Sequence, residues 1–276
     1  MTDKLGQILQ HTSEIRPMVH SITNNVTIND CANIILAAGG TAIMAQDERE
    51  VEEITANSDA LALNMGALRA QEAMLLAARE AKRLGHPVVL DPVAAGASRL
   101  RSEMCSRLLV DGLVSVIRGN ASEIRALAAG EEHAAGVEAS ALDRVTEENL
   151  AESAAWLAAF SRKTSTVVLL SGAIDLITDG TRTAALRGGS ALMSRITGAG
   201  CMLTSLTAAY CGANPNTLFE AVVTASGVMK VCGTLAERRV REEMEGTASF
   251  RTRLIDAVSL LSAEQLSEGL SIQLLQ

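Results

Sequence analysis

The hydrophobic positions of this chain follow two alternating periods along its length. Short runs in which nearly every residue is apolar predict β-strands at 17–23, 41–45, 60–65, 87–92, 114–118 and 165–170. Between them, apolar residues recur at helical spacing and predict helices at 27–38, 48–56, 69–84, 100–110, from 120 onward and 147–160. An Asp-Gly turn between runs at 174–180 and 183–187 predicts a β-hairpin. Further helices are predicted up to about 211, at 218–239 and at 250–261.

Most strand runs are apolar on both faces, as are strands of a parallel sheet that helices cover on both sides. Because these strands alternate with helices, the sequence predicts an α/β fold with one doubly wound, mostly parallel sheet. Residues 130–146 have weak periodicity, and we expect them to form a loop rather than a domain boundary. The chain is therefore expected to be a single domain over residues 1–276.

The composition narrows the class of protein. With 48% hydrophobic residues, a chain of 276 residues can bury a large core. The net charge is −8 and Lys and Arg form no cluster, so we expect neither a nucleic-acid nor a membrane partner. The N-terminal segment lacks the apolar core of a signal peptide, which favours a cytoplasmic protein. Five cysteines without a CxxC pair indicate reduced thiols.

A loop of small residues at 195–204, with the sequence RITGAGCMLT, runs directly into an apolar helix. The small side chains of Gly198, Ala199 and Gly200 allow a phosphate to approach the backbone, where the N–H groups and dipole of a helix start favour an anion. The same field is expected to lower the pKa of the Cys201 thiol and favour thiolate. The alternative is a tightly packed helix start in which Cys201 is only a small buried hydrophobe.

Several polar residues follow other predicted strands, and the carboxyl ends of such strands meet at the ligand-binding edge of a doubly wound sheet. Asp91 and Glu123 offer carboxylates for Mg²⁺, and Arg118 offers a guanidinium for phosphate. Together with the Gly-Cys loop, these groups indicate phosphoryl transfer. The two carboxylates also have possible structural roles: Asp91 could cap a turn, and Glu123 could complete a capping box with Asn120.

Other chemistries are excluded by missing motifs. No GxxxxGK[ST] loop is present, which argues against a P-loop NTPase, and there is no GxSxG nucleophile elbow. The four histidines lack HExxH spacing and the cysteines are isolated, so a zinc site is not expected. We interpret His20, near the end of the first strand, as a structural histidine rather than a base.

A set of motifs resembles the hydroxyethylthiazole kinase family of the ribokinase-like superfamily. The motifs occur in the family's order and at similar spacing across most of the chain: VHSITNNV (19–26), AIMA (42–45), NMG (64–66), LDPVAAGA (90–97), IRGNASEI (117–124), LLSGAIDLITDG (169–180) and ITGAGC (196–201). The resemblance implies a three-layer α/β/α ribokinase-like fold with a mostly parallel sheet. It also implies transfer of the ATP γ-phosphoryl group to the primary hydroxyl of 4-methyl-5-(2-hydroxyethyl)thiazole, in a homotrimer with substrate pockets between subunits.

The resemblance also implies roles for individual positions. Cys201 falls on the family's proposed catalytic base. The residues implied to contact the thiazole are Met44 and Gly198. Asn25, Val26 and Gly66 are implied to line the rest of its pocket. Those implied to contact ATP are Arg118 and Ser171, with Gly200 in the phosphate loop, and those implied to serve Mg²⁺ are Asp91 and Glu123.

The sequence departs from the family pattern at two positions, and it leaves two alternative functions open. The family often has threonine at Ser171 and GTGC in place of GAGC, so Ala199 contributes only its backbone near the phosphate. A kinase of a related heterocyclic alcohol, such as hydroxymethylpyrimidine, is the first alternative function. A non-catalytic protein that binds thiazole or nucleotide is the second, and the presence of Asp91, Glu123 and Cys201 argues against it.

Overall fold

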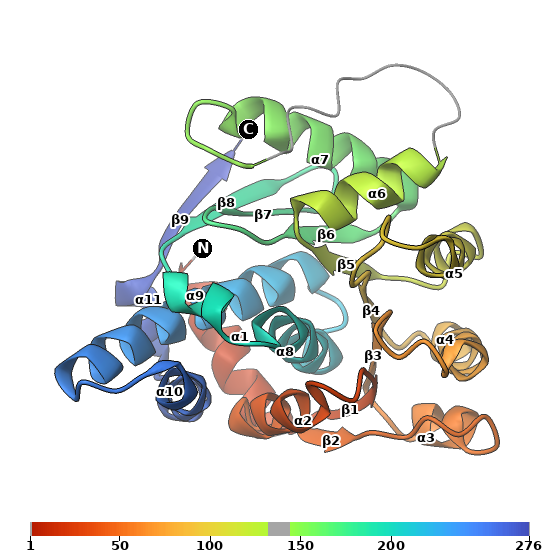
Figure 1. The fold of residues 1–276 in the computed structure, drawn as a ribbon, viewed down its shortest axis with the longest axis horizontal. Coiled ribbons are helices and arrows are strands. Elements are labelled where there is room, and N and C mark those ends of the chain that lie inside the picture. The colour runs from red at the N-terminus through yellow and green to blue at the C-terminus, as the bar shows by residue number, and fades with distance from the viewer. Residues whose placement is uncertain (1, 132–143, 276) are drawn as a thin grey trace.

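The structure, a computed structural model, describes residues 2–131 and 144–275. In this part of the chain nine strands form one sheet in the order β2-β1-β3-β4-β5-β6-β7-β8-β9 (Figure 1). The first six strands in this order are parallel, and β7, β8 and β9 are added antiparallel. Their bounds are β1 Met18–Ile22, β2 Thr41–Ile43, β3 Ala60–Asn64, β4 Val88–Asp91, β5 Val116–Gly119, β6 Val167–Leu170, β7 Asp175–Thr178, β8 Thr183–Arg187 and β9 Ser271–Leu275.

Helices cover both faces of this sheet and make the three layers visible in Figure 1. One face carries α1 Thr2–Ile15, α2 Ile28–Ala37, α8 Ala199–Ala213, α9 Leu218–Glu242, α10 Thr247–Leu260 and α11 Ala263–Gly269. The other face carries α3 Val51–Ala56, α4 Gln71–Leu84, α5 Arg99–Val110, α6 Ala121–Glu131 and α7 Leu150–Thr164. A short 3₁₀ helix, η2, spans Ala191–Arg195. The predicted three-layer α/β/α fold is confirmed.

The strands divide their side chains between the two layers. Along β3, Ala60 and Ala62 belong to the core on the α8 side, whereas Leu61 and Leu63 belong to the core on the α4 side. All five residues of β3 are buried, because helices cover both of its faces. This explains why the central strands are apolar without interruption in the sequence.

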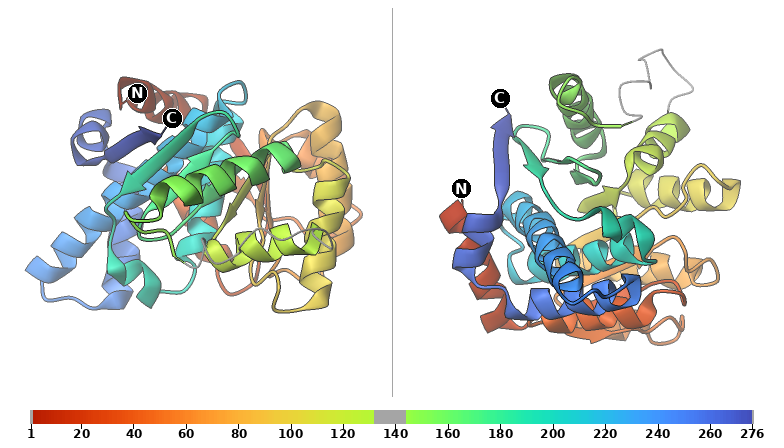
Figure 2. Two further views of the ribbon diagram at one scale, coloured as in Figure 1. Left: turned by 90° about the horizontal axis from the view of Figure 1, so that it is seen from above. Right: turned by 60° about the vertical axis from the view of Figure 1, so that its left-hand side comes forward.

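The predicted strands, the hairpin and the helices up to α10 are found close to their expected bounds. Four elements were not predicted: α1, η2, α11 and β9, of which β9 adds to the edge of β8. Figure 2 shows that α1 lies beside α11, so elements from the beginning and the end of the described chain pack together. Of the predicted loop at 130–146, residues 132–143 lie outside the described residues, and α6 extends to Glu131.

Among the described helices, α9 is long and apolar enough to cross a membrane. However, 83% of its most apolar window is buried inside the structure. Its side chains pack in the core between the sheet and α10. The helix is therefore accounted for as a core helix.

The strand order places a ligand-binding crevice at a definite point. The chain moves from β1 outward to β2, then crosses back to β3 on the other side of β1. In a doubly wound sheet, ligands bind beyond the carboxyl ends of the strands where the direction of winding changes. That point lies between β1 and β3, where the chain leaves the sheet at Thr23 and at Met65.

Candidate active site

Small residues at the start of α8 allow close packing around the helix terminus. Gly198 precedes the helix with φ +86°, and a Cβ there would lie 2.8 Å from Thr27 Cγ2. A Cβ at Gly200 would lie 2.5 Å from Arg118 Nη1. Packing within the protein therefore accounts for both glycines. The N–H groups of the first helical turn have no partner within the helix, so an anion could still bind them.

Cys201 lies in the first turn of α8 and contacts the switch point of the sheet. Its Sγ accepts hydrogen bonds from Asn64 Nδ2 at 3.2 Å and from Asn24 Nδ2 at 3.5 Å. Asn64 ends β3 and Asn24 follows β1, so the two amides hold the thiol between the two strands that flank the crevice. Asn64 Nδ2 also donates to Asp91 Oδ2 at 2.9 Å, which links the thiol to a carboxyl group.

The expectation that Cys201 is a thiolate is wrong. Burial and the charge of Asp91 raise the pKa of its thiol to about 11, although hydrogen bonds from Thr27 and Asn64 act in the opposite direction. The positive field of a helix start is outweighed by the loss of water around the sulfur. Cys201 is therefore a neutral thiol at neutral pH in the free protein.

Asp91 ends β4 and is completely buried. Its Oδ2 accepts hydrogen bonds from Asn64 and, at 3.0 Å, from Thr204 Oγ1. Its Oδ1 has no hydrogen-bond partner among the described residues and lies 3.7 Å from Arg118 Nη1. Burial raises the pKa of this carboxyl to about 6, against the lowering effect of Arg118. A buried carboxylate oxygen without a hydrogen-bond partner, such as Asp91 Oδ1, is suited to bind a cation that enters together with a ligand.

Arg118 connects this carboxyl to the next strand end. It lies in β5, and its Nη2 donates to Ser171 Oγ at 2.7 Å, directly after β6. Arg118, Ser171 and Gly200 all line a pocket of about 690 Å³ between the ends of β5 and β6, the start of α8 and the loop after β8. The structure thus brings together the residues that the sequence assigns to ATP.

Glu123 has the capping role that the sequence left open. Its Oε2 accepts the N–H of Asn120 at 2.9 Å, and Asn120 Oδ1 accepts the N–H of Glu123 at 3.0 Å, so the capping box is present. Its Oε1 accepts the N–H of Ala94 at 3.1 Å. Each carboxylate oxygen retains acceptor capacity, and the charge of Glu123 acts on the pKa of Asp91. Glu123 therefore contributes negative charge near Asp91 while it caps α6.

The residues assigned to the thiazole lie at the ends of three neighbouring strands. Met44 follows β2, Asn25 and Val26 follow β1, and Gly66 follows β3. A Cβ at Gly66 would come within 2.8 Å of Asn24 Cβ, so the loops after β1 and β3 touch. Met44 is half-buried, whereas Val26 is 75% exposed. These residues therefore lie at the same edge of the sheet as Asn24 and Asn64, the two residues that donate to Cys201.

The structure also defines the surroundings of His20 and of the cysteines. His20 is buried; Thr55 Oγ1 lies 2.8 Å from its Nδ1 and Ala45 O lies 3.0 Å from its Nε2, as expected for a structural histidine. All five cysteines lie in the described part of the chain and are free. Within that part, no group of three or more His, Cys, Asp or Glu side chains could hold a metal.

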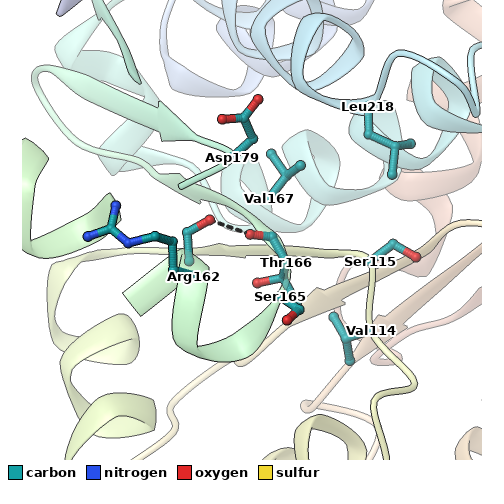
Figure 3. Close-up of a pocket in the computed structure, with 9 residues that line it drawn as sticks. Val114, Ser115, Arg162, Ser165, Thr166, Val167, Asp179 and Leu218 are labelled. Carbon is teal, nitrogen blue, oxygen red and sulfur yellow. Dashed lines mark hydrogen bonds between the residues drawn. The ribbon is translucent and has the colours of Figure 1, made fainter. Parts of the chain in front are cut away.

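A second pocket lies at the opposite end of the strands. It measures about 550 Å³ and is lined by residues that precede β5 and β6, among them Ser115 and Thr166 (Figure 3). Its polar side chains hold the local backbone: Ser161 Oγ donates to Thr166 O at 2.5 Å, and Arg162 Nη1 donates to Gly180 O at 2.6 Å. None of the predicted site residues lines this pocket.

The sequence interpretation assigned no role to three side chains of the site. Asn24, Asn64 and Thr204 donate to Cys201 or Asp91 and fix their positions. A signal was present for the first two, because Asn24 and Asn64 follow or end predicted strands at the switch point. Thr204 lies one turn after Gly200 in an apolar helix, where its hydroxyl also donates to the Gly200 carbonyl, and nothing in the sequence distinguishes it from a core threonine.

Comparisons with known proteins agree with this geometry. The model of the "Hydroxyethylthiazole kinase family" matches residues 9–264. A hydroxyethylthiazole kinase of Clostridium acetobutylicum is 42% identical over 96% of this chain and 97% of the relative, and one of Desulfovibrio desulfuricans is 43% identical over 98% of each. The solved structure of a hydroxyethylthiazole kinase from Pyrococcus horikoshii superimposes with a TM-score of 0.86 at 31% identity, and covers 99% of this chain and all of that one.

More distant structures share only the fold. An ADP complex of Bacillus subtilis pyridoxal kinase has a TM-score of 0.58 and 18% identity, over 79% of this chain and 91% of that one. The doubly wound sheet with helices on both faces, together with the similarity to solved structures of small-molecule kinases, places the chain in the ribokinase-like class of folds. Within this class, the chain belongs to the hydroxyethylthiazole kinase family.

Proposed function

We propose that this kinase transfers the γ-phosphoryl group of ATP to the primary hydroxyl of 4-methyl-5-(2-hydroxyethyl)thiazole in thiamine salvage. The observation that carries the proposal is the position of Cys201, bound by the amides of two strand ends and linked through Asn64 to the buried Asp91. All nine described strands belong to one sheet, which supports a single kinase domain over residues 1–276. Because the reaction needs ATP and the thiols are free, we place it in the cytoplasm.

The pocket of about 690 Å³ is the proposed nucleotide site. Its size suits a nucleotide, and Arg118 presents a guanidinium whose forked donors match phosphate oxygens. Ser171 holds that guanidinium and offers a hydroxyl donor in place of the family's usual threonine. Ala199 and Gly200, the first residues of α8, also line this pocket, at a helix start whose dipole would favour the transferring phosphoryl group.

Asp91 and Glu123 are the proposed Mg²⁺ residues. The unpaired Oδ1 of Asp91 and the charge of Glu123 fit a Mg²⁺ ion. Kinases hold this ion through one or two carboxylates, waters and the substrate phosphates. When bound, the ion would neutralise charge on the triphosphate. Both oxygens of Glu123 already accept backbone N–H groups, so we propose that this residue acts through water.

The proposed alcohol pocket lies on the other side of Cys201. Met44 and Val26 would provide apolar contacts for the thiazole ring, while Asn25, Gly66 and Gly198 would complete its wall. This arrangement would place the hydroxyl of the alcohol between Cys201 and the start of α8. Orientation of that hydroxyl towards the phosphoryl group would supply much of the rate. The small fraction of Cys201 present as thiolate would accept the hydroxyl proton late in the transfer and become the thiol.

A direct assay tests this function. Purified protein with ATP and Mg²⁺ should phosphorylate the thiazole alcohol with a higher kcat/KM than hydroxymethylpyrimidine, because the apolar side chains of Met44 and Val26 in the proposed pocket wall would favour the less polar ring. A preference for the pyrimidine alcohol would support the alternative kinase. Binding of both ligands without ATP turnover would support the non-catalytic alternative.

Replacement of Arg118 by alanine should weaken ATP binding more than binding of the thiazole alcohol. A charged hydrogen bond to phosphate contributes about 1.5–3 kcal/mol, which corresponds to about ten- to a hundredfold in Kd. Calorimetry with each ligand alone measures the two effects. Arg107→Ala, on the exposed side of α5, is the control and should change neither Kd. An equal loss for both ligands would show that Arg118 supports the fold instead.

We also propose that the protein is a homotrimer without ligand. Val26 is 75% exposed, and Leu68, on the loop that touches the one after β1, is 38% exposed, so apolar surface lies beside the proposed alcohol pocket. Ala45, which follows Met44, is buried and does not add to this surface. Light scattering should give three times the chain mass, and Val26→Asp should reduce it. A wild-type monomer at micromolar concentration would contradict the proposal.

A further inference from the structure

A buried lysine joins the loops of the proposed nucleotide pocket. Lys230, in the middle of α9, is only 6% exposed. Its Nζ donates to the carbonyls of Gly172 and Ala173, each at 3.2 Å, and to that of Gly188 at 3.4 Å. The same Nζ lies 3.1 Å from Asp175 Oδ1. One ammonium group thus contacts the turn after β6, the start of β7 and the end of β8.

The counter-charge of Lys230 is fixed as firmly as the lysine. Asp175 is buried; its Oδ1 accepts the N–H of Gly172 at 2.8 Å and its Oδ2 accepts the hydroxyl of Ser226 at 2.7 Å. Because the two charges offset each other at 3.1 Å, Lys230 adds little net positive charge to the pocket. A direct electrostatic role towards phosphate is therefore less consistent with this geometry than a role in holding backbone.

The backbone that Lys230 holds is part of the pocket. Gly172, Ala173, Gly188 and Gly189 line it together with Lys230 itself. Gly172 directly follows Ser171, the partner of Arg118. Gly188 and Gly189 have φ values of +98° and +89°. Glycine adopts this conformation easily, but because it adopts many others as well, it does not hold the loop in this one. A loop of this kind needs an external restraint to keep one conformation.

We propose that Lys230 is a positioning residue for the nucleotide, a tethered cation that orders the two loops on either side of the pocket before ATP binds. The inference rests on the assignment of this pocket to ATP in the proposed function. An ammonium group with three donors can bond several carbonyls at once, as a bound monovalent cation does, and its attachment to α9 fixes where they meet. Loss of this group should let the loops separate, so that each ATP molecule must order them on binding.

The test compares Lys230→Ala with wild type. The KM for ATP should rise by about tenfold or more, because ATP must then order the loops itself, and fixing the backbone of even one residue costs a comparable factor in affinity. The kcat and the KM for the thiazole alcohol should stay within about threefold of wild type, since Cys201 and Asp91 are not part of the lysine cluster. Propylammonium, which can enter the space that the side chain leaves, should restore the KM for ATP.

Controls separate this role from a loss of stability. Lys82→Met removes an exposed lysine that donates to a single carbonyl, that of Asp111, and should leave all three constants unchanged. Lys230→Met combined with Asp175→Asn removes both charges, so no buried carboxylate is left unpaired and the fold is kept. A raised KM for ATP in this double variant would support the proposal. An unchanged KM for ATP in any folded Lys230 variant would overturn it.

The outcome is also separable from that of the proposed function. If the wild-type protein does not phosphorylate the thiazole alcohol, the proposed function fails, but ATP affinity can still be measured by calorimetry without the alcohol. Weaker ATP binding in Lys230→Ala and its recovery with propylammonium would then still support the positioning role. Equal ATP affinity of the variant and the wild type would refute it.

Discussion

Replacement of Asp91 by asparagine should lower phosphoryl transfer by about a thousandfold, since several kcal/mol of charge stabilisation through a bound Mg²⁺ would be lost. The same change should make the free protein more stable at neutral pH. Asp91 is completely buried with one oxygen unpartnered, and an asparagine oxygen can still accept the hydrogen bonds of Asn64 and Thr204. A residue whose removal stabilises the fold and abolishes the reaction is present for function.

The pH dependence of stability provides a second readout. Burial raises the pKa of Asp91 from an ordinary value of 3.8 to about 6. The folded state therefore binds more protons than the unfolded state in this window, and the free energy of unfolding falls as pH rises through it. Denaturant unfolding of Asp91→Asn should lack this component. The control is Asp256→Asn, at an exposed position of α10, which should match wild type. Normal turnover of Asp91→Asn would show that Asp91 is not part of the proposed metal site.

Replacement of Cys201 by alanine should reduce the rate of phosphoryl transfer by about a hundredfold, the usual contribution of a positioned proton acceptor. Ligand affinities should change little, because the thiol would act on the hydroxyl proton rather than on the ring or the triphosphate. Cys201→Asp should stay active, since the helix start also favours a carboxylate. Cys211→Ala, further along α8 and buried in the core, is the control: it should cost stability but not rate.

The pH profile distinguishes a base from a passive thiol. The pKa of Cys201 is raised to about 11, so its thiolate fraction increases about tenfold for each pH unit between 7 and 9. The single-turnover rate of the wild type should rise over this range if the thiolate takes the proton. The rate of Cys201→Asp should not rise, because a carboxylate is already ionised there. A Cys201→Ala enzyme at full speed would leave catalysis to the loop amides and the metal.

The parts of the fold that the sequence predicts are those in which a local pattern coincides with burial. The strand that ends at Asp91 is apolar on both faces because helices cover both sides, and the Asp-Gly turn fixes the hairpin by itself. Helix α1 was not predicted, since it buries only a narrow stripe that includes Leu5 and Ile8, and it contains Gly6. Strand β9 is mostly exposed and is defined by its pairing with β8, which no local pattern reveals.

The candidate site shows the same limit. Strand ends predicted that Asp91, Arg118 and Cys201 would meet, because parallel strands share one carboxyl edge. The electrostatics could not be predicted in the same way. The helix dipole that acts on Cys201 is visible in the sequence, whereas the burial that outweighs it arises only when the strand ends and α8 pack together. Burial is a property of the assembled fold.

The packing of α1 has a consequence for folding during synthesis. This helix is synthesised before the sheet, whereas its partners α9 and α11 are made after the whole parallel part of the sheet. Until they leave the ribosome, Leu5 and Ile8 have no apolar surface on those helices to cover them. The edge of β8 likewise stays open until residues 271–275 are made. Nascent chains of this protein should therefore need chaperone protection for most of translation, even though their early βα units could already be forming.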